Sequence, residues 1–300
     1  METTVVCGYD ASPESRRALH WAAKEAALRQ EPLRVVMALP WADGAQVAAE
    51  PVGYLPTERK SVELATAAIE KAVRELTAGH HISVTSSVEL GAAIPTLLHE
   101  ARRASLLVLG ARGIGGFERM LLGSVSTAVA ERAGCPVVVV RPPAPRSEAA
   151  RHAGRVVVGV DGSPASEHAI GFAFEAAARR HSGLVAVHAS HPDPILQALA
   201  IVSVAKDGVD VLSSGASGLI DEAVSPWRDR YPDVPVTPFS MLGHPVTVLG
   251  YAAAGSPMLV VGTRGRGDLK AAALGSVSRG VLHHATGPVA VVPASTARLS

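Results

Sequence analysis

Residues 106–126 read LLVLGARGIGGFERMLLGSVS, and residues 258–278 read MLVVGTRGRGDLKAAALGSVS. In both stretches an apolar run ends at a glycine, a second glycine follows three residues later, and Gly-Ser comes ten residues after that. An apolar run that ends in glycine is typical of a strand entering a turn, and a following Gly-Ser is typical of a helix start. The spacing G-x2-G-x9-G-S therefore predicts the same strand, loop and helix start twice.

A glycine loop followed by a helix start suits a phosphate group. Glycine adopts positive φ and has no Cβ, so backbone N–H groups can approach a ligand closely. The first turn of a helix leaves N–H donors unpaired and carries a partial positive charge. We therefore predict two anion sites, in which two serine hydroxyls join the amides. The first consists of Gly110, Gly113, Gly123, Ser124, Val125 and Ser126, and the second of Gly262, Gly265, Gly275, Ser276, Val277 and Ser278.

The whole chain is a tandem repeat. Residues 5–13, VVCGYDASP, match residues 156–164, VVVGVDGSP, at a spacing of 151, whereas the glycine stretches are 152 apart. The second copy therefore contains one net insertion, which lies between its second and third strands. With 300 residues, of which 48% are hydrophobic, the chain is large enough for two cores. The predicted parts are a first domain at 1–142, a Pro- and Ala-rich linker at 143–154, a second domain at 155–293 and a tail at 294–300.

Apolar runs and amphipathic stretches alternate in each copy. Continuous aliphatic runs such as VVVV at 137–140 are typical of parallel strands covered on both faces, whereas ISVTSSVE at 82–89 alternates, as an edge strand does. Strands are predicted at 4–9, 33–39, 82–89, 105–110 and 136–141, and at 155–160, 184–190, 234–241, 257–262 and 288–293.

Helices are predicted between these strands. Ser12-Pro13 and Ser163-Pro164 combine an N-cap residue with proline at the first helical position. Residues 57–78 form a further amphipathic pattern, while glycines and a proline interrupt its counterpart around 195–230. We therefore expect the second copy to lack a continuous helix there.

Five strands separated by helices predict an α/β fold, with a doubly wound five-stranded parallel sheet in each copy. In the strand order 3-2-1-4-5 the winding reverses between strands 1 and 4, and ligands bind at such a point, outside the carboxyl ends of the strands. Asp10 ends strand 1 and Gly110 ends strand 4, and Asp161 and Gly262 are their counterparts. We therefore predict a crevice in each copy with a carboxylate facing the glycine loop.

These motifs resemble those of a tandem universal stress protein of the ATP-binding type, which has an adenine nucleotide alpha hydrolase-like fold. The resemblance covers residues 3–142 and 155–293. It implies that Asp10 and Asp161 contact adenine, and that the backbone of Ala38 and Ala189 does so too. It also implies that the two glycine sets line the ribose and phosphates of ATP, with Mg2+ bridging the phosphates. The implied role is a nucleotide-dependent regulator in stress response, with one adenine nucleotide per repeat.

The two glycine loops share one basic residue and differ at the position after the first glycine. Arg112, matched by Arg264, is the only basic residue that the two loops share, and its guanidinium either pairs with a phosphate or is a solvated loop charge. The position after the first glycine is usually hydroxylated in the family, but it is Ala111 in the first copy and Thr263 in the second. We expect the second site to bind somewhat better.

The motifs of other nucleotide enzymes are missing from the sequence. Neither GxxxxGK[ST] nor GxGxxG occurs, and no general base stands near the glycine loops. We therefore expect no enzyme beyond weak ATPase activity. Two alternatives stay open: an enzyme that hydrolyses ATP slowly or transfers nucleotidyl groups, and a scaffold with vestigial sites.

Charge and composition exclude some partners. A net charge of +1 without a basic block argues against nucleic acid and anionic membranes. The N-terminus lacks the pattern of a secretory signal and no apolar run is long enough to span a membrane, so we expect a cytoplasmic protein without metal or disulfide bridge. The fifth strands at 137–140 and 289–292 carry no edge-blunting charge, which predicts that they pair with each other, within the chain or in a homodimer.

Overall fold

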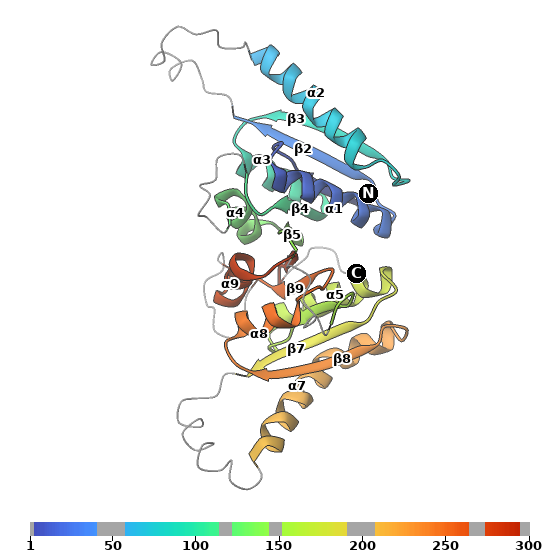
Figure 1. Ribbon diagram of the computed structural model, residues 1–300, viewed down its shortest axis with the longest axis vertical. Helices are drawn as coiled ribbons and strands as arrows, with labels where there is room; N and C mark the ends of the chain where they lie inside the picture. Colours follow the sequence, from blue (N-terminus) through green and yellow to red (C-terminus); the bar gives the residue numbers. More distant parts are fainter. Residues whose placement is uncertain are drawn as a thin grey trace. The chain divides into compact units, whose positions relative to one another are not determined.

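A computed structural model describes residues 3–40, 58–113, 122–143, 152–190, 208–263 and 274–294 (Figure 1). The chain divides into two compact units, unit 1 at Met1–Val140 and unit 2 at Arg141–Ser300. Parallel strands alternate with helices in both units, and the predicted α/β class is confirmed.

Unit 1 has five strands in the order β3-β2-β1-β4-β5, and adjacent strands are parallel. They are β1 (Thr4–Gly8), β2 (Leu33–Leu39), β3 (Val84–Leu90), β4 (Ala104–Gly110) and β5 (Val137–Val140). The winding reverses between β1 and β4, where Cys7 lies opposite Val108. The alternating strand β3 lies at the end of the order, as its pattern predicts.

Four helices cover the unit 1 sheet: α1 (Pro13–Arg29), α2 (Glu58–Leu76), α3 (Ala93–Ala101) and α4 (Ser124–Arg132). Helices α1 and α2 pack together on one face, and α3 and α4 pack together on the other (Figure 1). Helix α1 begins where the sequence predicts, because Ser12 accepts a hydrogen bond from the Ser15 N–H group at 3.1 Å and Pro13 follows it. Its apolar stripe, including Leu19 and Ala22, is fully buried against the sheet.

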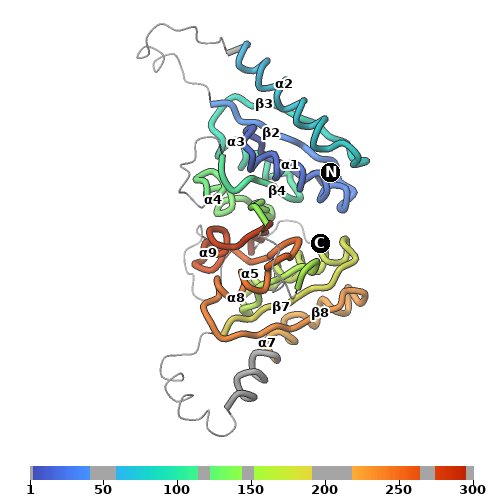
Figure 2. Tube along the Cα trace, in the orientation of Figure 1, coloured from blue at the N-terminus to red at the C-terminus, as the bar shows by residue number. Residues whose placement is uncertain are grey.

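Unit 2 repeats this order as β8-β7-β6-β9-β10, again with parallel pairings. Figure 2 shows β7 and β8 running side by side in yellow and orange. The strands are β6 (Val156–Gly159), β7 (Leu184–Ser190), β8 (Val236–Leu242), β9 (Leu259–Gly262) and β10 (Pro288–Val292). The helices are α5 (Pro164–Arg179), α7 (Gly208–Arg230), α8 (Pro245–Ala252) and α9 (Ser276–His284).

Helix α7 corrects one prediction, because it runs through the glycines and Pro226 that were expected to interrupt it. Long-range packing explains the difference. Trp227 of α7 stacks on Phe174 of α5 with ring centroids 6.4 Å apart. Gly171 makes room for the indole, since a β-carbon on this glycine would stand 2.3 Å from a Trp227 ring atom. Tertiary contacts of this kind outweigh the low helix propensity of glycine.

The chain is hydrogen-bonded within unit 2 at both ends of the predicted linker, at Pro142 just before it and at Gly154, its last residue. The Gly287 N–H group donates to the Pro142 carbonyl at 3.0 Å, and the Gly154 N–H group donates to the Gly255 carbonyl at 3.2 Å. Residues 144–151, between these ends, lie outside the described residues.

The two cysteines are buried free thiols. Burial raises the pKa of the Cys135 thiol to about 12 and raises the pKa of Cys7 further. Within the described ranges, no helix is both long and apolar enough to cross a membrane.

Candidate functional site

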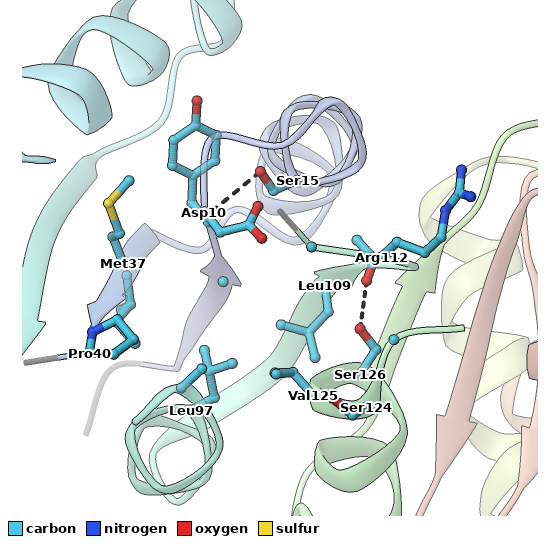
Figure 3. A pocket seen from close by; sticks show the side chains of 18 of the residues that line it. Asp10, Ser15, Met37, Pro40, Leu97, Leu109, Arg112, Ser124, Val125 and Ser126 are labelled. Atoms are coloured by element: carbon cyan, nitrogen blue, oxygen red, sulfur yellow. Dashed lines mark hydrogen bonds between the residues drawn. The ribbon is translucent and has the colours of Figure 1, made fainter. Parts of the chain in front are cut away.

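A cavity of about 630 Å³ opens at the carboxyl ends of the unit 1 strands (Figure 3). Its walls come from the ends of β1 and β2, from α3, from the loop that follows β4 and from the start of α4. Every unit 1 residue that we predicted for the site lines this cavity: Asp10, Ala38, Gly110, Arg112, Gly113, Gly123, Ser124, Val125 and Ser126. The fold thus brings together positions that are far apart in the sequence.

The cavity also has an apolar wall that sequence reasoning missed. Met37 and Pro40 lie on one side, Leu97 and Leu109 lie below, and Ser124 is at the opposite side (Figure 3). Met37 and Leu97 lie in apolar runs of the kind that core residues also form, so no sequence signal marks them as site residues. The result is a site with one apolar end and one end rich in backbone donors.

Asp10 closes the strand end of the cavity. Its Oδ1 atom accepts a hydrogen bond from the Ser12 N–H group at 3.0 Å, and its own N–H group donates to Ser15 Oγ at 3.3 Å. The other oxygen, Oδ2, faces the glycine loop, since a β-carbon on Gly113 would stand 2.5 Å from it. One oxygen therefore stabilises the turn into α1, and the other lies next to Gly113 in the loop that follows β4.

The backbone of Ala38 points into the space beyond the end of β1. The Tyr9 N–H group donates to the Val36 carbonyl at 2.9 Å, so residue 36 turns its backbone groups towards β1. In a strand, backbone direction repeats every two residues, so Ala38 turns its N–H and C=O groups the same way. Opposite Ala38, β1 has already ended, and the chain leads into α1. Ala38 therefore offers a donor and an acceptor to the cavity that it lines.

The positive φ expected for the motif glycines is wrong at the described positions, and close backbone approach replaces it. Gly110 packs against the start of α1, where a β-carbon would stand 2.8 Å from the Glu14 carbonyl carbon. Gly262 packs in the same way on Ala165, because a β-carbon on Gly262 would stand 2.7 Å from the Ala165 carbonyl oxygen. Positive φ is absent at Gly110, Gly113, Gly123, Gly262 and Gly275.

The first turn of α4 forms the donor-rich end of the cavity. The side chains of the described residues provide no cap for this helix, whose N-cap is Gly123. The Gly123 N–H group donates to the Ala111 carbonyl at 2.7 Å, which fixes the loop to the helix start. The next three residues, 124–126, line the cavity, and the N–H groups of a first helical turn have no partner within their helix. This is the arrangement of helix amides that the sequence predicts at the first anion site.

One of the two predicted serine hydroxyls has another partner. Ser126 is buried, and its Oγ donates to the Gly110 carbonyl at 2.7 Å. Its hydroxyl proton therefore ties the end of β4 to α4 and is unavailable to an anion. Ser124 is exposed at the mouth of the cavity and keeps the predicted position for a phosphate contact.

Arg112 is held by a carboxylate, which neither alternative for this residue included. Its Nη2 atom lies 2.9 Å from Glu14 Oε1, and Arg17 Nη2 lies 3.1 Å from the same oxygen. Ser12 Oγ also donates to the Arg112 carbonyl at 3.4 Å. Glu14 carries no motif signal in the sequence, because its partner is 98 residues away.

Unit 2 repeats the frame of this site. Asp161 Oδ1 accepts from the Ser163 N–H group at 2.9 Å, and Ser278 Oγ donates to the Gly262 carbonyl at 2.6 Å. The Gly275 N–H group donates to the Thr263 carbonyl at 2.7 Å. Among the other predicted residues, Ala189 lies in β7, and Ser276 and Val277 begin α9. Arg264 and Gly265 lie outside the described residues.

Ala189 has the same backbone direction as Ala38. The Val160 N–H group donates to the Val187 carbonyl at 2.8 Å, so Ala189 also points past the end of the first strand. His188 takes the position of Met37, and its Nδ1 donates to the Val160 carbonyl at 2.7 Å. The part of the chain that the structure describes contains no cluster of three His, Cys, Asp or Glu side chains suited to a metal ion.

Known proteins are similar to this chain in sequence and in fold. The universal stress protein family matches twice, at residues 1–141 and 152–293. Universal stress protein Rv2005c of Mycobacterium tuberculosis is 37% identical over 295 residues, which cover 96% of each chain. A universal stress protein of Mycolicibacterium smegmatis is 33% identical over 298 residues and 97% of each chain.

A solved structure extends the likeness to the fold. The crystal structure of a universal stress protein from Archaeoglobus fulgidus DSM 4304 matches with a TM-score of 0.66 at 18% identity, over 97% of this chain and 98% of that one. The double match to the family and the relatives that span almost the whole chain agree with the two repeated units. The chain belongs to the universal stress protein family and carries two copies of its domain.

Proposed function

We propose that the protein binds one adenine nucleotide, ATP, in each repeat and acts as a nucleotide-dependent regulator in stress response. The supporting observation is the unit 1 cavity, which joins an apolar wall to the uncapped start of α4. Its volume of about 630 Å³ is within the usual range for small-molecule sites. A flat base suits the apolar end, and phosphates suit the helix start.

The base end of the cavity fits adenine through backbone groups. Ala38 offers a donor and an acceptor beyond the end of β1. Adenine carries an amino donor next to a ring-nitrogen acceptor, so the two edges are complementary. Asp10 supplies a carboxylate that can accept a further donor from the base or the ribose. In unit 2, Ala189 and Asp161 would take these roles.

We propose that any hydrolysis is slow. The described walls of the phosphate end consist of helix amides, glycines, the Ser124 hydroxyl and an arginine held by Glu14. None of these groups has the chemistry of a general base at neutral pH, and the Asp10 carboxylate of the cavity is assigned to the base or the ribose in this proposal. Mg2+ would then be held mainly by the phosphates, as is usual for this ion.

Two measurements test the nucleotide proposal. Mass spectrometry of ligand released from freshly purified protein should identify an adenine nucleotide. Calorimetry of stripped protein should show ATP binding, and Asp10→Asn should weaken the unit 1 component alone. No heat at millimolar ATP, with circular dichroism showing folded protein, would overturn the proposal.

The alternative functions make different predictions. Rapid Mg2+-dependent release of ADP or pyrophosphate that disappears in Gly275→Ala or Ser276→Ala would favour an enzyme. Oligomeric state and partner binding that do not respond to ATP would favour a scaffold.

Two further expectations stay predictions. The uncharged sequences of the fifth strands favour pairing of these strands, within the chain or in a homodimer. Cross-linking from residues flanking 137–140 and 289–292, combined with size measurement in solution, would separate these arrangements. Cell fractionation would test the cytoplasmic location.

A further inference from the structure

Glu14 joins two cations at the edge of the proposed phosphate site. It is the second residue of α1, and its side chain is only 11% exposed. Its Oε1 atom accepts from Arg112 Nη2 at 2.9 Å and from Arg17 Nη2 at 3.1 Å. Arg112 comes from the loop after β4, so this carboxylate connects the loop to α1.

The Arg112 side chain starts next to the phosphate end of the cavity. A β-carbon on Gly123, at the start of α4, would stand 3.5 Å from the Arg112 Cα atom. From there the side chain extends away from Ser124 and Val125 (Figure 3), towards Glu14. A guanidinium that could reach an anion at the helix start is therefore held by a carboxylate of the protein.

We propose that Glu14 determines how strongly the unit 1 site prefers phosphorylated nucleotides. The outer phosphates of a nucleotide must compete with Glu14 for the Arg112 guanidinium, whereas adenosine has no group that does so. Glu14 is thus a positioning residue that lowers the preference of this site for ATP over adenosine. The inference depends on nucleotide binding at the cavity, as proposed above.

The internal repeat provides a natural comparison. Glu14 and Arg17 align with Ala165 and His168 of unit 2. Ala165 is buried and has no charge, and His168 Nδ1 lies 3.0 Å from the Pro164 carbonyl. The position in unit 2 that corresponds to Glu14 therefore carries no carboxylate. We expect unit 2 to prefer ATP over adenosine more strongly than unit 1 does.

The expected effect is modest because the ion pair is partly exposed. The Arg112 side chain is 36% exposed, and pairs of this kind contribute little. Replacing Glu14 by alanine should therefore raise the ratio of ATP affinity to adenosine affinity in unit 1 by roughly twofold to fivefold.

The two sites can be observed separately in the full-length chain. In protein labelled with nitrogen-15 glycine, the NMR amide resonances of Gly123 and Gly275 report on unit 1 and unit 2, respectively. The protein is titrated with adenosine and, separately, with ATP, and the shifts of both resonances are followed. In Glu14→Ala, the Gly123 resonance should show the raised ratio, and the Gly275 resonance should not change its ratio. Ala165→Glu is the reciprocal variant, which should lower the ratio at Gly275.

A double-mutant cycle separates positioning from simple repulsion. If Glu14 acts by holding Arg112, then Glu14→Ala should have no effect on the ratio in an Arg112→Ala background. Glu14→Gln keeps the shape of the side chain and removes its charge. If the charge of Glu14 causes the effect, and not a change in the stability of α1, Glu14→Gln should raise the ratio as Glu14→Ala does. Thermal unfolding of each variant verifies that unit 1 is folded.

The outcomes distinguish the two proposals. ATP binding with an unchanged ratio in Glu14→Ala, or a raised ratio that persists without Arg112, would overturn the inference and leave the proposed function intact. The absence of any shift at Gly123 with either ligand, in folded protein, would overturn both.

Discussion

Oδ2 of Asp10 lies where a side chain on Gly113 would begin, because a β-carbon built on this glycine would be 2.5 Å from that oxygen. Asp10 lies two residues beyond the end of β1, and Gly113 lies three residues beyond the end of β4. The contact therefore joins the two halves of the doubly wound sheet at the point where its winding reverses. It also means that the glycine determines where the carboxylate can be.

Gly113→Ala should weaken nucleotide binding in unit 1 with little loss of stability. The methyl group meets the end of a side chain, so the Asp10 carboxylate can move away at low cost. Calorimetry and thermal unfolding should separate the two effects. Wild-type affinity in this variant would show that the position of Asp10 is irrelevant to the ligand.

Gly110→Ala should instead destabilise unit 1. Its β-carbon would stand 2.8 Å from the Glu14 carbonyl carbon and 2.9 Å from the Ser15 nitrogen, which are backbone atoms of α1. Overpacking against backbone costs about 1–3 kcal/mol. Urea unfolding followed by hydrogen exchange in unit 1 measures the loss. Gly134→Ala is the matched control, since its β-carbon would meet no atom within 4 Å; equal losses in the two variants would contradict the prediction.

Ala11→Gly should stabilise unit 1. Ala11 has a φ of 65°, a left-handed conformation that glycine adopts more easily, and its counterpart Gly162 has a φ of 72°. Glycine relieves this strain but increases the backbone entropy of the unfolded chain. The net free energy of unfolding should rise by up to about 1 kcal/mol. The reciprocal Gly162→Ala should destabilise unit 2 by a similar amount. A lower melting temperature in Ala11→Gly would refute the account.

Both thiols should resist Ellman's reagent at pH 8 in the native protein. The thiolate is the reactive form, and burial raises the pKa of Cys135 to about 12, so the thiolate is scarce at this pH. Cys7 is buried more completely and its pKa is raised further. Both should react at once in guanidinium chloride. Rapid labelling of native protein at pH 8 would contradict the burial of the thiols.

The sheet was predictable because its signals are local. Aliphatic runs such as 137–140 mark buried parallel strands, and Ser-Pro pairs mark the starts of α1 and α5. The position of the cavity was predictable too, since Asp10 closely follows β1 and Gly110 ends β4, the two strands next to the reversal of winding.

The misses have a common physical cause, which is contact between distant parts of the chain. Glycine spacing indicates a special backbone, but it does not distinguish positive φ from the close packing that Gly110 has against α1. The partner of Arg112 and the stacking of Trp227 on Phe174 depend on how helices are placed after folding. Such pairings leave no periodic pattern in one sequence.

Two hydrogen bonds, from Gly123 to Ala111 and from Ser126 to Gly110, join the end of β4 to the start of α4. The entropic cost of bringing the two ends of a chain segment together grows only slowly with the length of the segment. Residues 117–122, FERMLL, and their counterparts LKAAAL at 269–274 have in common only the final leucine. Evolution, or an engineer grafting a peptide, could therefore change the sequence between these two joined points and leave the described start of α4 where it is.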